Sequence, residues 1–203
     1  MKVKFCGLTR DADIAAANAA RPDLIGLVFA DSRRRVTDEQ AARLRAQLAR
    51  GIQAVGVFVQ DDPAHIAALV EAGTIDLIQL HGGEDAAYIA ALRALTRAPL
   101  LYAVRVREHT DIERAAALDV DYLLLDTYVK GVAGGSGQKF DWSLIGTVEK
   151  PFFLAGGLTE DDLPRALRTG AFALDLSSGI ETDGRKDRTK MCRIAARIRG
   201  EEP

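Results

Sequence analysis

The stretch KVKFCGLT, residues 2–9, decides between two parallel α/β folds. It begins as a short strand-like run and ends directly in a loop that contains a glycine. An open doubly wound sheet that binds a dinucleotide carries G-x-G-x-x-G after its first strand. Residues 6–9 read Cys-Gly-Leu-Thr, so that signature is missing. The opening therefore favours the other architecture, the (β/α)8 barrel.

The rest of the chain alternates short apolar runs with Ala/Leu/Arg-rich stretches, at about 25 residues per unit. Most runs are nearly continuous, as expected for strands that are buried on both faces. The predicted strands are residues 2–6, 24–29, 53–58, 77–81, 100–106, 122–126, 152–155 and 173–177. The predicted helices are residues 11–20, 38–49, 63–72, 84–95, 111–118, 142–148, 161–169 and 188–199. Eight units predict a single α/β domain over residues 1–203, a (β/α)8 TIM barrel, whereas an open sheet usually has about five or six strands.

Composition argues against several classes of function. The 203 residues carry a net charge of −2 with both signs interspersed, so nothing points to nucleic acid as a partner. The one dense basic spot, Arg33–Arg35, is too small for a nucleic-acid groove but suits one carboxylate or phosphate. No apolar stretch is long enough for a membrane span. Two cysteines without metal-ligand spacing, and no signal-peptide pattern, predict a cytoplasmic protein with neither a disulfide framework nor a metal site.

Polar side chains end several predicted strands, where barrel enzymes carry their chemistry. Cys6 ends the first strand, His81 the fourth and Asp126 the sixth. Each has a structural alternative: Cys6 as a small buried apolar side chain, and Asp126 as a helix cap or loop brace. His81 either orients a ligand or holds a loop. Cys192 is expected to be structural, because it lies in the middle of a predicted helix.

Three glycine-rich turns, at residues 134–137, 155–158 and 177–181, expose backbone N–H groups of the kind that bind phosphate. The last two follow the seventh and eighth predicted strands, where many barrels hold a phosphate group. The alternative is turn chemistry alone, in which glycine supplies a positive φ. The candidate phosphate-binding residues are Gly134, Gly135, Ser136, Gly137, Gly156, Gly157, Ser178 and Gly179.

These motifs, in order and over nearly the whole chain, resemble those of the phosphoribosylanthranilate isomerase family. The matching stretches are KFCGLT (4–9), GLVF (26–29), SRRRV (32–36), VGVF (55–58), QLHG (79–82), LLD (124–126), GGSG (134–137), FDW (140–142), LAGGL (154–158) and DLSSGIE (175–181), with Gly184 and residues 186–187. Two positions depart from the family pattern. Arg33 stands where the family usually has proline, and Ser136 where it usually has threonine.

The resemblance implies an isomerase of tryptophan biosynthesis that needs no cofactor and acts on a small phosphorylated substrate. The implied reaction is the Amadori rearrangement of N-(5-phosphoribosyl)anthranilate to 1-(2-carboxyphenylamino)-1-deoxyribulose 5-phosphate. By resemblance, Cys6 matches the general base, Asp126 the general acid and Arg34 the arginine that holds the substrate carboxylate. His81 and Asp175 match further substrate-binding positions. The oligomeric state, monomer or homodimer, is left open.

The residue types suit this chemistry. A carboxylic acid such as Asp126 can protonate the sugar ring oxygen as the ring opens. A thiolate at Cys6 is a competent base for the proton on C2′. An ordinary thiol is mostly protonated at neutral pH, so we expect the site to lower the pKa of Cys6, with help from Lys4 on the same strand face.

Two rival functions remain at this stage. The first is the related isomerase of histidine biosynthesis, which typically has an aspartate where Cys6 stands and a longer chain. The second is a barrel that only binds a phosphorylated sugar, for which Cys6 and Asp126 together would be unnecessary. Assays with both aminoaldose substrates separate the three functions.

Overall fold

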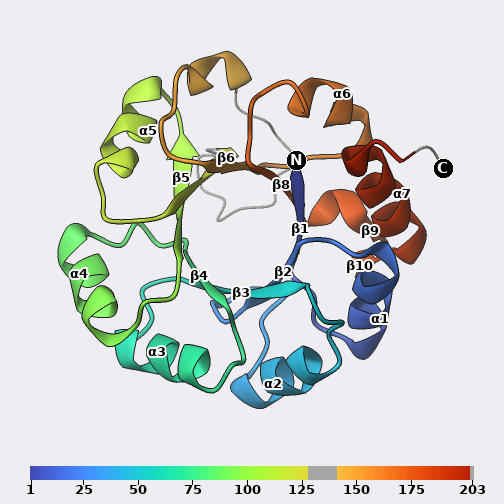
Figure 1. Cartoon of the computed structure of the whole chain (residues 1–203), viewed down its shortest axis with the longest axis horizontal. Helices are drawn as coiled ribbons and strands as arrows, with labels where there is room; N and C mark the ends of the chain where they lie inside the picture. The colour runs from blue at the N-terminus through green and yellow to red at the C-terminus, as the bar shows by residue number, and fades with distance from the viewer. Residues whose placement is uncertain (128–140, 202–203) are drawn as a thin grey trace.

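A computed structural model of the chain describes residues 1–127 and 141–201. In it, eight parallel strands form a closed barrel in chain order, and helices surround it (Figure 1). The strands are β1 (Lys2–Cys6), β2 (Leu24–Val28), β3 (Gln53–Phe58), β4 (Leu77–Leu80), β5 (Leu100–Val106), β6 (Tyr122–Thr127), β7 (Phe152–Leu154) and β8 (Ala173–Leu176). Direct pairing of β8 with β1 closes the barrel, so the predicted fold is confirmed.

The outer layer contains seven α-helices within the described residues. They are α1 (Asp11–Ala20), α2 (Asp38–Ala46), α3 (Pro63–Glu71), α4 (Ala86–Leu95), α5 (His109–Ala116), α6 (Leu163–Ala166) and α7 (Arg188–Arg199). Side-chain caps explain several starts: Thr37 accepts a hydrogen bond from Gln40 N, and Asp62 caps α3 ahead of a proline. None of the helices that the structure describes has the length and apolar character to cross a membrane.

The structure corrects several predicted boundaries. The predicted helix at 142–148 is a single 3-10 turn, η1 (Trp142–Ile145), because Gly146 follows with a φ of 58°. The predicted helix at 161–169 is split into a 3-10 turn, η2 (Glu160–Asp162), and the short α6. Pro164 fits only the first turn of a helix, which fixes where α6 can begin.

A further 3-10 turn, η3 (Ser178–Ile180), and a small hairpin of β9 (Glu181–Thr182) and β10 (Arg185–Lys186) were not predicted. The hairpin turns at Asp183 and Gly184, which both have positive φ. It lies between β8 and α7, and it brings Glu181 and Lys186 to the carboxyl end of the barrel. The missed hairpin therefore contributes directly to the site described below.

Side chains inside the barrel form layers, because alternate residues of each strand point inward. The lower part is apolar. Its buried residues are Leu24, Val55, Leu77, Leu101, Ala103, Leu124, Phe153, Ala155 and Ala173. Lys4, Gln79 and Asp175 follow at inward positions, and Lys4 is paired in register with Asp175. The two-residue period then places Cys6 and His81 one layer higher, at the mouth.

Candidate active site

A buried lysine lies at the centre of the polar layer. Lys4 Nζ donates to Gln79 Oε1 and to Asp175 Oδ2, each at 2.9 Å, and the lysine side chain has no exposed surface. Burial is the largest influence on its pKa and acts to lower it, but the opposing charges of Asp175 and Cys6 prevail and raise the pKa of Lys4. A positive ammonium group is therefore fixed beneath the barrel mouth.

Cys6 lies directly beyond this ammonium, at the end of β1. A Cβ atom at residue 26 would lie 2.6 Å from Cys6 Sγ, so glycine at that position leaves room for the thiol. Burial raises the pKa of the Cys6 thiol, although Lys4 and Lys186 act in the opposite direction. The expectation of a lowered pKa is therefore wrong: desolvation, aided by the negative charge of Asp175, outweighs the two lysines.

Asp126 and His81 meet across the mouth. His81 Nε2 lies 3.5 Å from Asp126 Oδ2, and both side chains are largely covered. The other ring nitrogen, His81 Nδ1, lies 2.9 Å from Gln79 Nε2. Asp126 also accepts from the Thr127 backbone N–H at 2.8 Å, which holds its carboxyl group in place. Asp126 thus joins a chain of polar contacts that leads back through His81 and Gln79 to Lys4.

The structure therefore brings together four of the predicted residues, Cys6, His81, Asp126 and Asp175. Gln79 joins them, although the sequence assigned it no role. The signal for Gln79 was its position two residues before His81 on one strand, which puts both side chains on the inner face. Among the described residues, no cluster of three or more His, Cys, Asp and Glu side chains is arranged to hold a metal ion.

Arg34 lies in the loop after β2 and packs against Gly7, in the loop that follows β1. Its Nε and Nη2 donate to Glu181 Oε1 and Oε2 at 2.9 and 3.0 Å. Arg33 reaches the same carboxylate at 3.3 Å, but its side chain is 65% exposed against 20% for Arg34. Gly7, with a φ of 77°, lets Arg34 pass close by, since a Cβ there would lie 2.3 Å from Arg34 Cδ. The packing makes Arg34 the fixed arginine of the pair.

Glu181 is the partner that sequence reasoning missed, although it lies in a matched motif. It also accepts from Lys186 Nζ at 2.7 Å. Partial burial is the largest influence on its pKa and acts upward, yet the hydrogen bonds from Arg34 and Lys186 lower the pKa of Glu181 to about 2. An anionic Glu181 therefore ties the β9–β10 hairpin to Arg34.

Glu181→Gln should make the stability of the protein less sensitive to acid. The folded-state pKa of Glu181 lies below its value in the unfolded chain, near 4.3. The ionised carboxylate therefore stabilises the fold fully above about pH 4.3, and this contribution is lost as the pH falls towards 2. Urea unfolding midpoints across this range should fall more steeply for the wild type than for Glu181→Gln. Glu71→Gln, at an exposed position, is the control; parallel curves for all three proteins would contradict the prediction.

The glycine turns after β7 and β8 lie against each other. Gly156 and Gly157 have φ values of 91° and 66°, so turn chemistry accounts for both of these glycines. Gly179 is required for another reason, because a Cβ there would lie 1.9 Å from the Leu158 carbonyl oxygen. The backbones of the two turns are therefore in direct contact.

The turn after β8 also contacts β1, the strand that ends in Cys6. Ser177 Oγ donates to the Cys6 carbonyl oxygen at 3.0 Å, and Ser178 begins η3. The third glycine turn, Gly134–Gly137, lies outside the described residues. Two of the three predicted turns are thus adjacent to each other, and the one after β8 also contacts Cys6.

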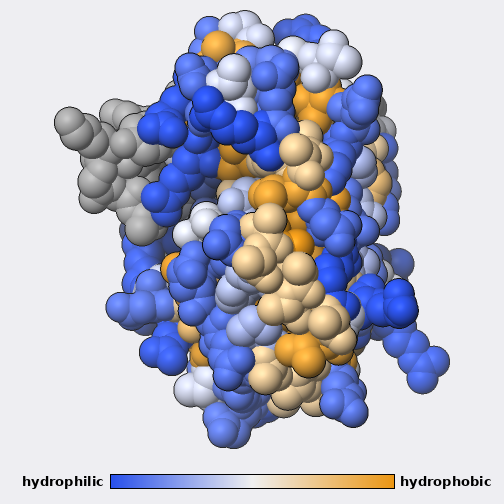
Figure 2. All heavy atoms as spheres, turned by 90° about the vertical axis from the view of Figure 1, so that its left-hand side faces the viewer, coloured by the Kyte–Doolittle hydropathy of each residue, from blue (hydrophilic) through white to orange (hydrophobic). Residues whose placement is uncertain are grey.

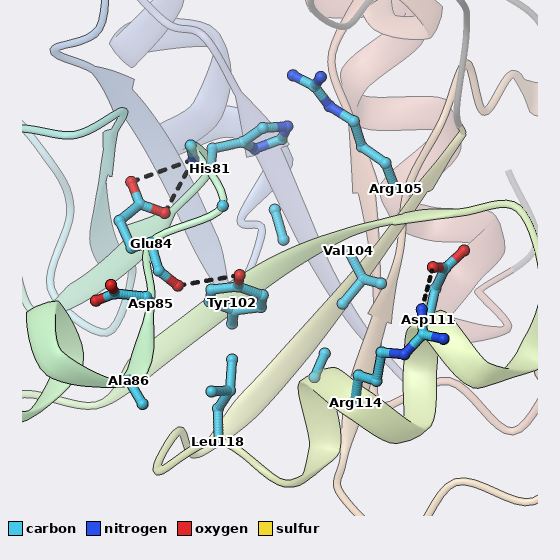
Figure 3. A pocket seen from close by; sticks show the side chains of 14 residues that line it. His81, Glu84, Asp85, Ala86, Tyr102, Val104, Arg105, Asp111, Arg114 and Leu118 are labelled. Atoms are coloured by element: carbon cyan, nitrogen blue, oxygen red, sulfur yellow. Dashed lines mark hydrogen bonds and ion pairs between the residues drawn. The ribbon is translucent and has the colours of Figure 1, made fainter.

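A cleft of about 510 Å³ opens beside the mouth, between α4 and α5 (Figure 3). His81 and Arg105 line its upper end, and Leu118 lines its lower end. Cys6 and Asp126 do not line it, so the cleft is a side opening of the polar cluster and not its centre. Figure 2 shows the outer face of the same part of the barrel, where hydrophobic side chains gather in a strip between polar ones.

Comparison with known proteins identifies the family. The model of the family described as N-(5'-phosphoribosyl)anthranilate (PRA) isomerase matches residues 3–197. The chain belongs to this family. It is 45% identical over 191 residues to N-(5'-phosphoribosyl)anthranilate isomerase of Endomicrobium trichonymphae, with 94% of each chain covered.

Solved structures of this isomerase family have the same barrel. The phosphoribosyl anthranilate isomerase of Thermotoga maritima matches with a TM-score of 0.86 and 30% identity, over 98% of this chain and 99% of that one. A second structure holds reduced 1-(o-carboxyphenylamino)-1-deoxyribulose 5-phosphate. It matches with a TM-score of 0.83 and 30% identity, over the same shares of the two chains.

Proposed function

We propose that the protein catalyses the Amadori rearrangement of N-(5-phosphoribosyl)anthranilate to 1-(2-carboxyphenylamino)-1-deoxyribulose 5-phosphate in tryptophan biosynthesis, by general acid/base catalysis. The observation that carries the proposal is a thiol and a carboxyl group at one barrel mouth, on β1 and β6, next to paired glycine turns. A relative of similar fold binds the reduced form of this product, which supports the assignment.

The substrate carries two anionic groups, and the mouth offers a cationic or donor group for each. Backbone N–H groups of the turns at Gly156–Gly157 and Ser178–Gly179 would hold the phosphate. The guanidinium of Arg34 would hold the anthranilate carboxylate with the donors that Glu181 leaves free. The sugar then lies between these ends, over Cys6 and Asp126.

Asp175 has a spare acceptor for the substrate. Its Oδ2 accepts from Lys4, whereas its buried Oδ1 has no hydrogen-bond partner among the described residues. An unpaired buried oxygen is costly, so a substrate N–H or hydroxyl that reaches it would be bound favourably. His81, at the same mouth, would contact the sugar side of the substrate.

Two proton transfers by the protein lead to an enolamine, which then tautomerises. Asp126 gives its proton to the ring oxygen, the C1′–O bond breaks, and a protonated Schiff base forms with the anthranilate nitrogen. Cys6 then removes the proton from C2′, the electron pair of that C–H bond forms the C1′=C2′ double bond of an enolamine, and the π pair of the C1′=N bond returns to nitrogen. Tautomerisation of the enolamine to the ketone completes the product. The ammonium groups of Lys4 and Lys186 favour the thiolate that the second transfer needs.

The decisive experiment follows the fluorescence of phosphoribosylanthranilate as the purified protein consumes it. We expect turnover of this substrate and none of the aminoaldose of histidine biosynthesis. Turnover of the histidine substrate alone would assign the other isomerase activity. Binding without turnover of either substrate would assign a binding protein.

Arg34→Ala should raise KM far more than it lowers kcat. Loss of a hydrogen-bonded contact to a charged carboxylate costs about 1.5–3 kcal/mol, or about 10- to 150-fold in binding. Arg33→Ala is the matched control, because Arg33 is mostly exposed and contacts the same Glu181 carboxylate. Steady-state kinetics of both variants give the two KM values. A larger rise in KM for Arg33→Ala would show that Arg33, and not Arg34, holds the substrate carboxylate.

Gly179→Ala should weaken phosphate binding. The new Cβ would collide with the Leu158 carbonyl oxygen, so the two glycine turns must move apart. We expect about a tenfold or larger rise in KM, and a similar loss of competitive inhibition by inorganic phosphate. Gly170→Ala is the control for a general loss of stability: its φ of 76° strains an alanine, but open space surrounds it and it lies outside both glycine turns. Unchanged phosphate inhibition in Gly179→Ala would place the phosphate group elsewhere.

Four expectations from the sequence stay predictions. They are a single domain over residues 1–203, a reaction without a cofactor, a cytoplasmic location, and assembly as a monomer or homodimer. Sedimentation of the purified protein at several concentrations measures the last of these directly.

A further inference from the structure

The contact between Lys4 and Gln79 fixes which way the Gln79 amide points. An ammonium group has donors only, so the Gln79 atom 2.9 Å from Lys4 Nζ must be the carbonyl oxygen, Oε1. The amide NH2 group then points the opposite way, towards His81. Lys4 is fully buried and also held by Asp175, so its ammonium group fixes the orientation of the Gln79 amide.

This orientation determines the protonation of His81. An amide NH2 group can only donate, so His81 Nδ1, 2.9 Å from Gln79 Nε2, must accept and carry no proton. A neutral imidazole without a proton on Nδ1 carries it on Nε2. Nε2 is the ring atom that faces Asp126 Oδ2, at 3.5 Å.

We propose that Gln79 is a positioning residue that holds His81 as the neutral Nε2–H tautomer, with its N–H directed at the carboxyl group of Asp126. The proposal deepens the proposed function, since its importance rests on Asp126 as the proton donor. The buried Lys4 ammonium thus fixes the orientation of the Gln79 amide, and the amide fixes the tautomer of the His81 imidazole.

The two other protonation states of His81 would impair an acid at Asp126. With the proton on Nδ1, the Nε2 lone pair would face Asp126 and compete for the proton that the substrate needs. A doubly protonated imidazolium would form an ion pair with the carboxylate and keep Asp126 ionised. Both states place a proton on Nδ1, directly against the Gln79 NH2 group. Gln79 therefore excludes both, and the Nε2–H group stabilises the carboxylate after Asp126 has given up its proton.

Two further charged side chains, Arg105 and Glu84, line the cleft next to His81. Arg105, on β5, lines the same cleft as His81 and is in register with Asp126 (Figure 3). Glu84 lines the cleft as well, but its carboxylate is turned towards the backbone N–H groups of Gln60 and Gly82, from which it accepts hydrogen bonds.

The first test measures the tautomer of His81 in the wild-type protein. The chain has only 3 histidines, so the ring nitrogens of a 15N-histidine-labelled sample can be assigned one by one, with a His81→Asn sample identifying the His81 signals. We expect, at neutral pH, an unprotonated Nδ1 and a protonated Nε2 for His81. A proton on Nδ1, in either the neutral or the charged ring, would overturn the proposal.

Gln79→Glu replaces the hydrogen-bond donor next to His81 Nδ1 by an acceptor. A carboxylate accepts from both neighbours, so it can hold the Lys4 ammonium and a proton on His81 Nδ1 together. We expect the His81 signals to move to a state with Nδ1 protonated, and kcat to fall by about 10- to 100-fold with a smaller change in KM. Gln53→Glu makes the same charge change at an exposed strand position and should alter neither.

Gln79→Met removes the donor without adding charge, and it provides a second test in case Gln79→Glu does not fold. Its His81 should lose the fixed tautomer and show both neutral forms in exchange. A His81 spectrum like that of the wild type in both variants would show that Gln79 does not set the tautomer. These spectra do not depend on turnover, so failure of the proposed function would show in the activity assay alone.

Discussion

Cys6→Ala should abolish turnover while the protein stays folded and still binds its product. The thiol lies at the end of β1, with Lys4 beneath it and Gly26 leaving room for its sulfur. Removal of a general base costs about 10²–10⁴-fold or more in kcat, whereas the proposed contacts to phosphate and carboxylate do not involve the thiol. Single-turnover kinetics and product titration measure the two effects separately.

Cys192→Ala is the matched control. Cys192 lies in α7 and packs against the apolar core, so its loss should leave kcat unchanged. Near-normal kcat in Cys6→Ala would remove Cys6 from the mechanism and return it to the role of a small buried side chain.

The pH dependence provides a second test of Cys6. A base must be deprotonated to act, and burial raises the pKa of this thiol. The thiolate fraction therefore keeps growing above the ordinary cysteine pKa of about 8.5. The limb of the kcat/KM profile that reports Cys6 should rise at a higher pH than an exposed thiol would give. Because kcat/KM reports the free enzyme, a limb well below that pH would contradict a raised pKa for Cys6.

Position along a strand made much of this site predictable. Cys6, His81 and Asp126 each end or follow an apolar run, and the carboxyl ends of barrel strands meet at one mouth. The predicted fold was therefore enough to expect these three side chains close together. It was not enough to predict the direction in which the pKa of Cys6 shifts, because the effect of Lys4 depends on its pairing with Asp175, 171 residues away in the chain.

Gln79 shows why the contacts within the polar layer could not be predicted. Gln79 lies between apolar residues of β4, and the matched stretch that it begins, QLHG, gave it no role. Its role follows from contacts with Lys4, 75 residues away, and with His81. The alternation of side chains along β4 predicts that Gln79 points into the barrel. Its contact partners depend on how β1, β4 and β8 are aligned with one another, which the sequence does not show.

Glu181 was missed for a related reason. It lies in a hairpin whose strands are two residues each, too short for any periodic pattern. Its partner Arg34 comes from the loop after β2, 147 residues earlier. Sequence reasoning could identify the arginine but not the carboxylate that holds it.

Asp126→Asn should keep substrate binding and lose most turnover. Asparagine has the shape of aspartate but no acidic proton, so the ring oxygen would leave without general acid catalysis, at a cost of about 10²–10⁴-fold in kcat. The kcat/KM profile of the wild type should have two limbs, one for the acid and one for the base. The variant should lose the limb that reports the acid. KM should stay close to the wild-type value, because the proposed phosphate and carboxylate contacts are made by other residues.

Asp119→Asn removes the same charge from a side chain that is 82% exposed, so it should behave as wild type. If Asp126→Asn has normal kcat and an unchanged profile, Asp126 only braces the loop through its bond with Thr127. His81 would then be the next candidate for the acid, since its Nε2 lies at the same mouth. A neutral Nε2–H imidazole is a much weaker acid than a carboxylic acid, however, and Gln79 opposes a second proton on the ring. The tautomer that the structure favours for His81 is therefore itself an argument that Asp126 supplies the proton.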